Sequence, residues 1–299
     1  MALLIITTIL WAFSFSLIGE YLAGSVDSYF SVLMRVGLAA LVFLPFLRTR
    51  GQSPRTIVLY MLVGAMQLGI MYLLAFRAYL YLTVSEFLLF TVFTPLYITL
   101  IYDLLSGRKL RWGYLLSAAL AVLGAAIIRY DKVSDHFWTG LLLVQLSNLC
   151  FAIGMVGYKR LMEVRPMPQH NAFAWFYVGA FIVAVAAWFM LGNVQKLPTT
   201  TLQWSVLVWL GVVASGLGYF MWNYGATQVD AGTLGIMNNV HVPAGLLVNL
   251  AIWQEQPHWP SFISGALVIL ASLWVHRRWV APHSGQTADD RRRGSAQSE

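Results

Sequence analysis

The sequence predicts an all-helical, polytopic membrane protein with about ten transmembrane helices, arranged as two inverted repeats of five. Three observations predict this fold. Of the 299 residues, 59% are hydrophobic and only 10% are charged, whereas a water-soluble domain carries about 25% charged residues. The apolar residues form long continuous runs, close to the roughly 20 residues that cross about 30 Å of hydrocarbon. Segments of the first half also recur in the second.

Ten apolar runs follow one another along the chain, and each predicts a transmembrane helix. In order they are 2–19, 29–46, 57–76, 87–102, 112–128, 137–158, 172–191, 204–222, 231–253 and 262–275. The fourth and tenth are short, so we expect their helices to extend further. A membrane β-barrel is excluded because its strands alternate between apolar and polar residues in short segments.

The two ends of the chain differ in character. The first run lacks the positive n-region of a signal peptide, because no Lys or Arg precedes Trp11. Nine further runs follow it, so we interpret it as the first transmembrane helix. Residues 281–299 are polar, with Gly, Ser, Gln and charged residues. This composition predicts a disordered tail.

The net charge of +7 is distributed unevenly over the predicted loops. With the N-terminus inside, one side of the membrane receives fourteen Lys and Arg residues and the other receives four. The fourteen are Arg48, Arg50, Arg55, Arg108, Lys109, Arg111, Lys159, Arg160, Arg165, Arg277, Arg278, Arg291, Arg292 and Arg293. The four are Arg77, Arg129, Lys132 and Lys196. The positive-inside rule therefore places both termini on the cytoplasmic side of the membrane. Anionic lipids, rather than nucleic acid, are the expected partners of this charge.

An internal duplication is indicated by matched positions. Pro95 and Pro243 each follow an Ala by seventeen positions, and the two prolines are 148 positions apart. Trp112 and Trp259 are 147 positions apart. The halves are then 1–131 and 132–280. Five spans per half is an odd number, so the second half must insert in the opposite orientation, an arrangement common in carriers. The alternative is convergence of apolar sequence.

The chain resembles the drug/metabolite transporter superfamily, with paired EamA-type domains, over about residues 1–280. The matching stretches are Leu10-Trp11-Ala12-Phe13, Arg35, Phe76 to Thr83, Thr94-Pro95-Leu96-Tyr97, Gly107-Arg108-Lys109-Leu110 and Tyr224 to Val229. Within that superfamily it is similar to the bacterial carriers that take up biotin. The resemblance implies two five-helix domains and import of a small organic solute, with biotin as the expected substrate.

Enzyme, metal and cofactor chemistry have no support in the sequence. The metalloprotease, P-loop and nucleophile-elbow motifs are all absent. Cys150 is the single cysteine, so a Cys-rich metal site and a disulfide within the chain are excluded. We therefore predict a protein that is not an enzyme and that needs no cofactor. The sequence leaves the oligomeric state open, with a monomer as one alternative.

Charged and titratable side chains inside spans are costly in hydrocarbon, so they usually face a cavity or a partner. Arg35 is a candidate ligand for a substrate carboxylate or a structural donor to carbonyl groups. Glu86 is a candidate proton carrier or a fixed partner of Arg77. His241 is a candidate for substrate binding or proton transfer, or a neutral packing residue.

Neutral polar and aromatic side chains in the spans complete the predicted substrate site. Pro95 and Pro243 break their helices at matching places in the two halves, which is a pointer to a transport site. Amide side chains could bond a polar head group, or could instead link helices. Aromatic rings could line the apolar part of a solute or face lipid. These candidates are Gln67, Asn148, Asn223, Asn238, Asn239, Trp11, Tyr72, Trp175, Tyr219 and Trp222.

The function that these features favour is a secondary carrier whose substrate site lies between the two halves. Two alternatives stay open. One is an exporter of amino acids or related metabolites, and the other is a membrane scaffold or an intramembrane enzyme.

Overall fold

The computed structural model describes residues 2–105, 135–229 and 244–254 as continuous stretches, and scattered positions within 116–127, 237–240 and 259–278. In these parts of the chain every regular element is a helix. Seven helical spans are long and apolar enough to cross a membrane. They match the first four predicted spans and the sixth, seventh and eighth. The other three predicted spans and the tail fall largely or wholly on residues outside the described part.

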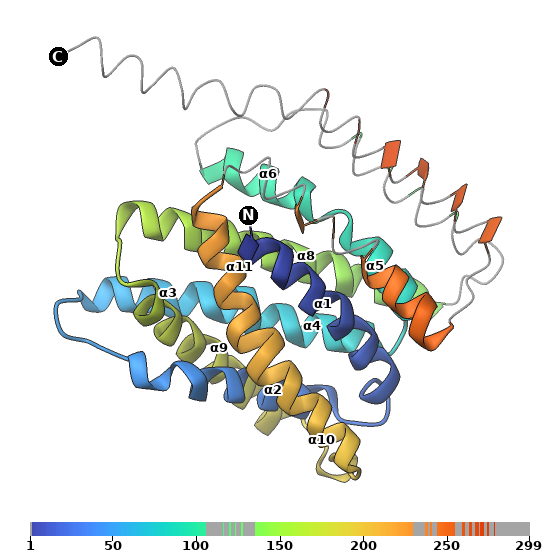
Figure 1. Cartoon of the computed structure of the whole chain (residues 1–299), viewed down its shortest axis with the longest axis horizontal. Coiled ribbons are helices and arrows are strands. Elements are labelled where there is room, and N and C mark those ends of the chain that lie inside the picture. Colours follow the sequence, from blue (N-terminus) through green and yellow to red (C-terminus); the bar gives the residue numbers. More distant parts are fainter. Residues whose placement is uncertain are drawn as a thin grey trace.

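The described elements are the following, and Figure 1 labels the α-helices among them. The first half contains α1 (Ala2–Tyr21), α2 (Ser28–Phe43) with the 3₁₀ turn η1 (Leu44–Phe46), α3 (Pro54–Gly64), η2 (Ala65–Ile70), α4 (Met71–Ala78), α5 (Val84–Thr91) and α6 (Thr94–Leu105). The second half contains α8 (Asp135–Val164), α9 (Gln169–Leu191), the 3₁₀ turn η4 (Val194–Lys196), α10 (Thr201–Val208), η5 (Trp209–Leu217), α11 (Gly218–Thr227) and η6 (Asn249–Trp253).

Several helices begin a turn before the apolar runs because polar residues cap them. Ser53 accepts a hydrogen bond from the backbone N–H of Thr56 at the start of α3. Thr83 and Glu86 form a capping box at the start of α5, and Thr200 and Gln203 form another at α10. Each cap satisfies backbone N–H groups that have no partner within the helix. The capped turn is too polar to be recognised from hydropathy alone.

Two of the spans contain π-helix at corresponding places. The third span passes through η2 between α3 and α4, and the eighth passes through η5 between α10 and α11. The offset of 148 positions between the halves maps Ala65–Ile70 onto 213–218, which overlaps η5. A π-helix shifts the hydrogen-bond register and is frequent at functional sites.

The two halves pack against each other in matched pairs. The helix α2 packs on η5, and α9, its counterpart by chain order, packs on η2 and α3. The helix α1 runs along α11, as α8 runs along α4 (Figure 1). These contacts form equivalent pairs, as they would if a pseudo-two-fold axis related the two halves.

Glycines permit the closest of these crossings. A Cβ atom on Gly64 of α3 would lie 1.9 Å from the carbonyl oxygen of Phe176, and one on Gly179 of α9 would lie 1.9 Å from that of Met61. Small residues let backbones approach each other, and packing contacts then hold helices together in lipid. The contact fixes the third span beside the seventh, and with it the residues that η2 carries.

Candidate functional site

A cavity lies among the helices of both halves. Its lining comes from α1, α2, α4, α5, α6, α8 and α11, with Asn238 from the predicted ninth span. Its volume of about 80 Å³ holds several waters, since one water needs roughly 10–15 Å³. The lining residues are Trp11, Ser14, Phe15, Ile18, Arg35, Met71, Tyr72, Ala75, Phe76, Tyr79, Phe87, Thr91, Thr94, Ser147, Asn148, Phe151, Tyr219 and Asn238.

Arg35 is the charged residue of this cavity. Its side chain is 3% exposed. Its Nε donates to Ser215 Oγ at 2.5 Å, and its Cζ lies 4.2 Å from the centroid of the Tyr72 ring. Within the described residues no carboxylate pairs with it, because its partners there are a hydroxyl and aromatic rings. A buried guanidinium with neutral partners retains N–H groups that can receive an anion.

Ser215 holds Arg35 in this position. It lies in η5, and its hydroxyl is 2.8 Å from the hydroxyl of Tyr72. The hydroxyl of Tyr177 donates to the Ser215 carbonyl oxygen at 2.5 Å. The π-helical register leaves that carbonyl able to accept a side-chain donor. Elements from three spans therefore fix the guanidinium at one end of the cavity.

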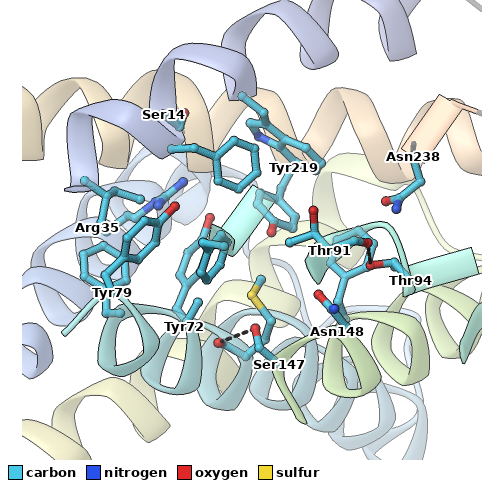
Figure 2. A pocket seen from close by; sticks show the side chains of 18 residues that line it. Ser14, Arg35, Tyr72, Tyr79, Thr91, Thr94, Ser147, Asn148, Tyr219 and Asn238 are labelled. Atoms are coloured by element: carbon cyan, nitrogen blue, oxygen red, sulfur yellow. Dashed lines mark hydrogen bonds between the residues drawn. The ribbon is translucent and has the colours of Figure 1, made fainter. Parts of the chain in front are cut away.

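The far end of the cavity is neutral and polar (Figure 2). Pro95 has no N–H, so it cannot donate to the Thr91 carbonyl oxygen, which accepts from Thr94 Oγ1 at 2.7 Å instead. Asn148 Nδ2 donates to the Phe90 carbonyl oxygen at 2.9 Å. The break between α5 and α6 is thus satisfied by side chains, as irregular backbone in a membrane requires.

Aromatic rings form the wall between the two ends. Trp11 Nε1 donates to the Ala214 carbonyl oxygen at 3.0 Å. Its ring centroid lies 4.6 Å from that of Tyr219, and the Tyr219 centroid lies 5.8 Å from that of Tyr72. These rings offer a rigid apolar surface to a solute.

A closed layer lies beyond this wall, toward the ends of α8 and α11 that carry Lys159 and Ala226. The amides of Gln67 and Asn223 exchange two hydrogen bonds of 3.0 and 3.1 Å, and both side chains are fully buried. Trp222 Nε1 donates to Met155 Sδ at 3.4 Å. Lys159 Nζ donates to the carbonyl oxygen of Val229 at 2.6 Å.

The predicted site residues therefore divide into groups. Trp11, Arg35, Tyr72, Asn148, Tyr219 and Asn238 line the cavity. Gln67, Trp222 and Asn223 lie in the closed layer, where the described geometry gives them helix-to-helix contacts. Trp175 donates to the Arg48 carbonyl oxygen, away from the cavity. The predicted residues Asn239, His241 and Pro243 lie outside the described residues.

Glu86 and its neighbour Arg77 lie at the start of α5 and the end of α4. Glu86 is buried, and its Oε2 accepts from the backbone N–H of Thr83 at 2.9 Å. The Arg77 Cζ lies 5.8 Å from the centroid of the Tyr29 ring. The carboxylate thus has a capping role, and its proposed role in proton transfer stays a prediction.

Sequence reasoning did not select Ser215, Ser147 or Tyr79 as site residues, and it placed Thr91 and Thr94 beside Pro95 without counting them among the substrate-binding residues. A usable signal existed for Ser215, because it is 148 positions after Gln67, the offset that relates the two prolines. Thr91 and Thr94 also carry a signal, since they stand within one turn of Pro95.

Comparison with known proteins gives a consistent result. Residues 1–130 and 138–277 each match the model of the EamA-like transporter family. Over 299 residues, the full length of both chains, the protein is 83% identical to the biotin transporters of Escherichia coli K12 and Salmonella typhimurium. It is 55% identical to the probable biotin transporter of Pseudomonas aeruginosa, over 93% of this chain and 97% of that one.

A crystal structure with 17% sequence identity shares the fold, with a TM-score of 0.63 over 92% of this chain and 95% of that one. The family model covers both halves, and the described helices include seven of membrane length. The chain is therefore a multi-pass membrane protein that belongs to the EamA-like transporter family of the drug/metabolite transporter superfamily.

Proposed function

We propose that the protein is a secondary carrier that imports biotin across the bacterial inner membrane by alternating access. The substrate is supported by the full-length relatives that are named biotin transporters. Both termini lie in the cytoplasm in this proposal, as the distribution of Lys and Arg indicates. The two halves are inverted repeats that rock about a site between them.

The observation that carries the proposal is the buried guanidinium of Arg35 at one end of an aromatic-lined cavity. A charge at membrane depth is costly, so such a residue marks a site that receives a counter-ion or substrate. Arg35 has no acidic partner among the residues described. Biotin carries a carboxylate on an apolar chain, so it supplies the missing anion and also contacts the rings of Trp11 and Tyr219.

The closed layer supports a conformation that is loaded from outside. Lys159 belongs to the set of positive residues predicted to face the cytoplasm, and it donates to the backbone carbonyl oxygens of Ala226, at the end of the eighth span, and Val229, just beyond it. The cavity lies on the other side of the Gln67–Asn223 pair, toward the ends of α1 and α4. In import, biotin enters on that side, and the halves then separate at the closed layer.

The test is uptake of labelled biotin into proteoliposomes that contain only this protein. We expect wild-type protein to accumulate biotin and Arg35→Gln to raise the KM at least tenfold. Charge-assisted hydrogen bonds contribute about 1.5–3 kcal/mol, and 1.4 kcal/mol corresponds to tenfold in affinity. Arg77→Gln is the matched control, because Arg77 lies at the end of α4 and does not line the cavity.

Direction is tested separately in cells. A biotin auxotroph without its own carrier should grow on less external biotin when this protein is expressed. Resistance to amino-acid analogues without any change in the biotin requirement would instead favour export, and would reject import of biotin.

A further inference from the structure

The two ends of the cavity offer different chemistry to a solute. Arg35 with Tyr72 forms a cationic end, and Asn148 with Thr94 and Asn238 forms a neutral amide and hydroxyl end. Figure 2 shows Arg35 and Asn238 on opposite sides of the cavity, with Tyr219 and Tyr72 between them. A solute that fills the cavity therefore has one charged end and one neutral polar end.

Asn238 is the unusual residue of the neutral end. Its side chain is 1% exposed, and its Nδ2 has no hydrogen-bond partner within the described part of the chain. A buried amide donor without a partner costs about 1–3 kcal/mol. Because the side chain lines the cavity and its amide points to the side where Thr94 and Asn148 lie (Figure 2), a ligand can supply the missing acceptor.

Asn148 supplies the complementary group. Its Nδ2 is engaged by the Phe90 carbonyl oxygen, and more weakly by Gln145 Oε1 at 3.5 Å. That bond fixes which way the amide points, because a carbonyl oxygen accepts only from the nitrogen. Its Oδ1 has no donor among the residues whose contacts are described. A donor on Asn238 and an acceptor on Asn148 thus border the same end of the cavity.

We propose that this end selects a neutral head group that presents a carbonyl acceptor beside an N–H donor, and that it thereby fixes the orientation of the solute. This inference rests on the proposed function and specifies it further. The ureido ring of biotin is such a head group. Its carbonyl oxygen accepts from Asn238, one N–H donates to Asn148 Oδ1, and the carboxylate lies at Arg35. The reverse orientation places the carboxylate at an end with no described cation and leaves Arg35 without its anion, so it is disfavoured.

The experiment measures inhibition of labelled-biotin uptake in proteoliposomes by two analogues. Biotin amide keeps the ureido ring and lacks the carboxylate, whereas lipoate has a carboxylated chain on a ring without a ureido group. For wild-type protein we expect unlabelled biotin to inhibit better than either analogue. Asn238→Leu should weaken inhibition by biotin and by biotin amide about tenfold and leave inhibition by lipoate unchanged. Arg35→Gln should weaken inhibition by biotin and by lipoate and leave inhibition by biotin amide unchanged.

Asn249→Leu is the matched control for Asn238→Leu. Asn249 is also a buried asparagine of the predicted ninth span and does not line the cavity, so the preference for biotin over lipoate should persist. If Asn238→Leu does not fold, Asn238→Ala takes its place. The ratio of the inhibition constants for biotin and lipoate is then compared between this variant and the wild-type protein. The inference would be overturned if the Asn238 variants weakened inhibition by biotin and inhibition by lipoate to the same extent. Failure of wild-type protein to transport biotin would reject the proposed function itself.

Discussion

Ser215 shows how a neutral residue can control a buried charge. Its hydroxyl accepts from Arg35 Nε and also contacts the Tyr72 hydroxyl. Arg has several rotatable bonds, so an unheld guanidinium loses conformational entropy when it binds an anion. The hydrogen bond to Ser215 lowers that cost by fixing the group before the solute arrives, which is the role of preorganisation in binding.

Ser215→Ala should therefore weaken biotin binding without abolishing it. We expect the KM for uptake to rise about three- to tenfold, because the variant keeps the guanidinium charge and loses one positioning hydrogen bond, and a typical hydrogen bond contributes about 0.5–1.5 kcal/mol. The measurement is initial uptake in proteoliposomes. Ser205→Ala is the control, because Ser205 lies in α10 of the same span and bonds its own helix at an exposed position. An unchanged KM in the Ser215 variant would show that Arg35 does not need this support.

At the level of single residues, the sequence predicted which side chains are unusual but could not assign their surroundings. Arg35 and Gln67 are both polar residues inside apolar runs, and each stands out because burying a polar group in lipid is costly. That cost is relieved equally by a cavity and by a partner on another helix. Arg35 lines the cavity, whereas Gln67 pairs with Asn223, and only the packing of the helices distinguishes the two outcomes.

The helical elements were more predictable than their contacts. Seven predicted runs correspond to helices because apolar length dominates the choice of structure in lipid. The deviations are at the ends, where capping residues such as Thr83 extend the helices, and at η2 and η5, where a π-helix has no hydropathy signal. The crossing of α3 and α9 depends on two glycines that are inconspicuous among the 24 of the chain.

Gly179→Val should separate α3 from α9. A Cβ atom at this position would overlap the backbone at Met61, so one helix must move, and overpacking costs about 1–3 kcal/mol. We expect a lower Tm in detergent and weaker biotin uptake, because η2 carries residues next to the cavity. Ile182→Val on the lipid-exposed face of α9 is the control and should leave the Tm nearly unchanged. Equal Tm values for both variants would contradict the proposed packing.

The pair formed by Gln67 and Asn223 links η2 to α11 and can be tested by a double-mutant cycle. Gln67→Leu or Asn223→Leu alone leaves a buried amide without its partner, which costs about 1–3 kcal/mol. The double replacement removes both amides, so its Tm should be higher than that of either single variant. Additive losses of Tm would show that the two residues act independently.

For the whole molecule, the strongest sequence signal was the repeat, and it extends beyond the residues that first suggested it. The offset that relates Pro95 to Pro243 also relates Gln67 to Ser215 and maps the π-helix η2 onto a stretch that overlaps the π-helix η5. In the first half, Gln67 bonds Asn223 in the closed layer. In the second half, Ser215 accepts the hydrogen bond from Arg35. The inverted insertion of the halves would place these two functions on either side of the same midplane, which is the geometry that alternating access needs.

Energy coupling is the remaining property of the whole carrier, and Glu86 allows a direct test. We propose that biotin uptake is driven by a proton gradient, with Glu86 or His241 carrying the proton. Glu86→Gln separates this role from helix capping, because a glutamine at the same position still accepts from the Thr83 N–H and completes the capping box. If Glu86 carries the proton, this variant should lose the response of uptake to an imposed pH difference and retain exchange of external for internal biotin.

The control is Glu20→Gln, at an exposed position near the end of α1, which should keep both the response to the pH difference and the exchange of biotin. Gradient-driven accumulation by the Glu86 variant would remove this residue from the coupling mechanism and leave His241 to be tested, whereas wild-type uptake that is independent of the gradient would exclude proton coupling altogether.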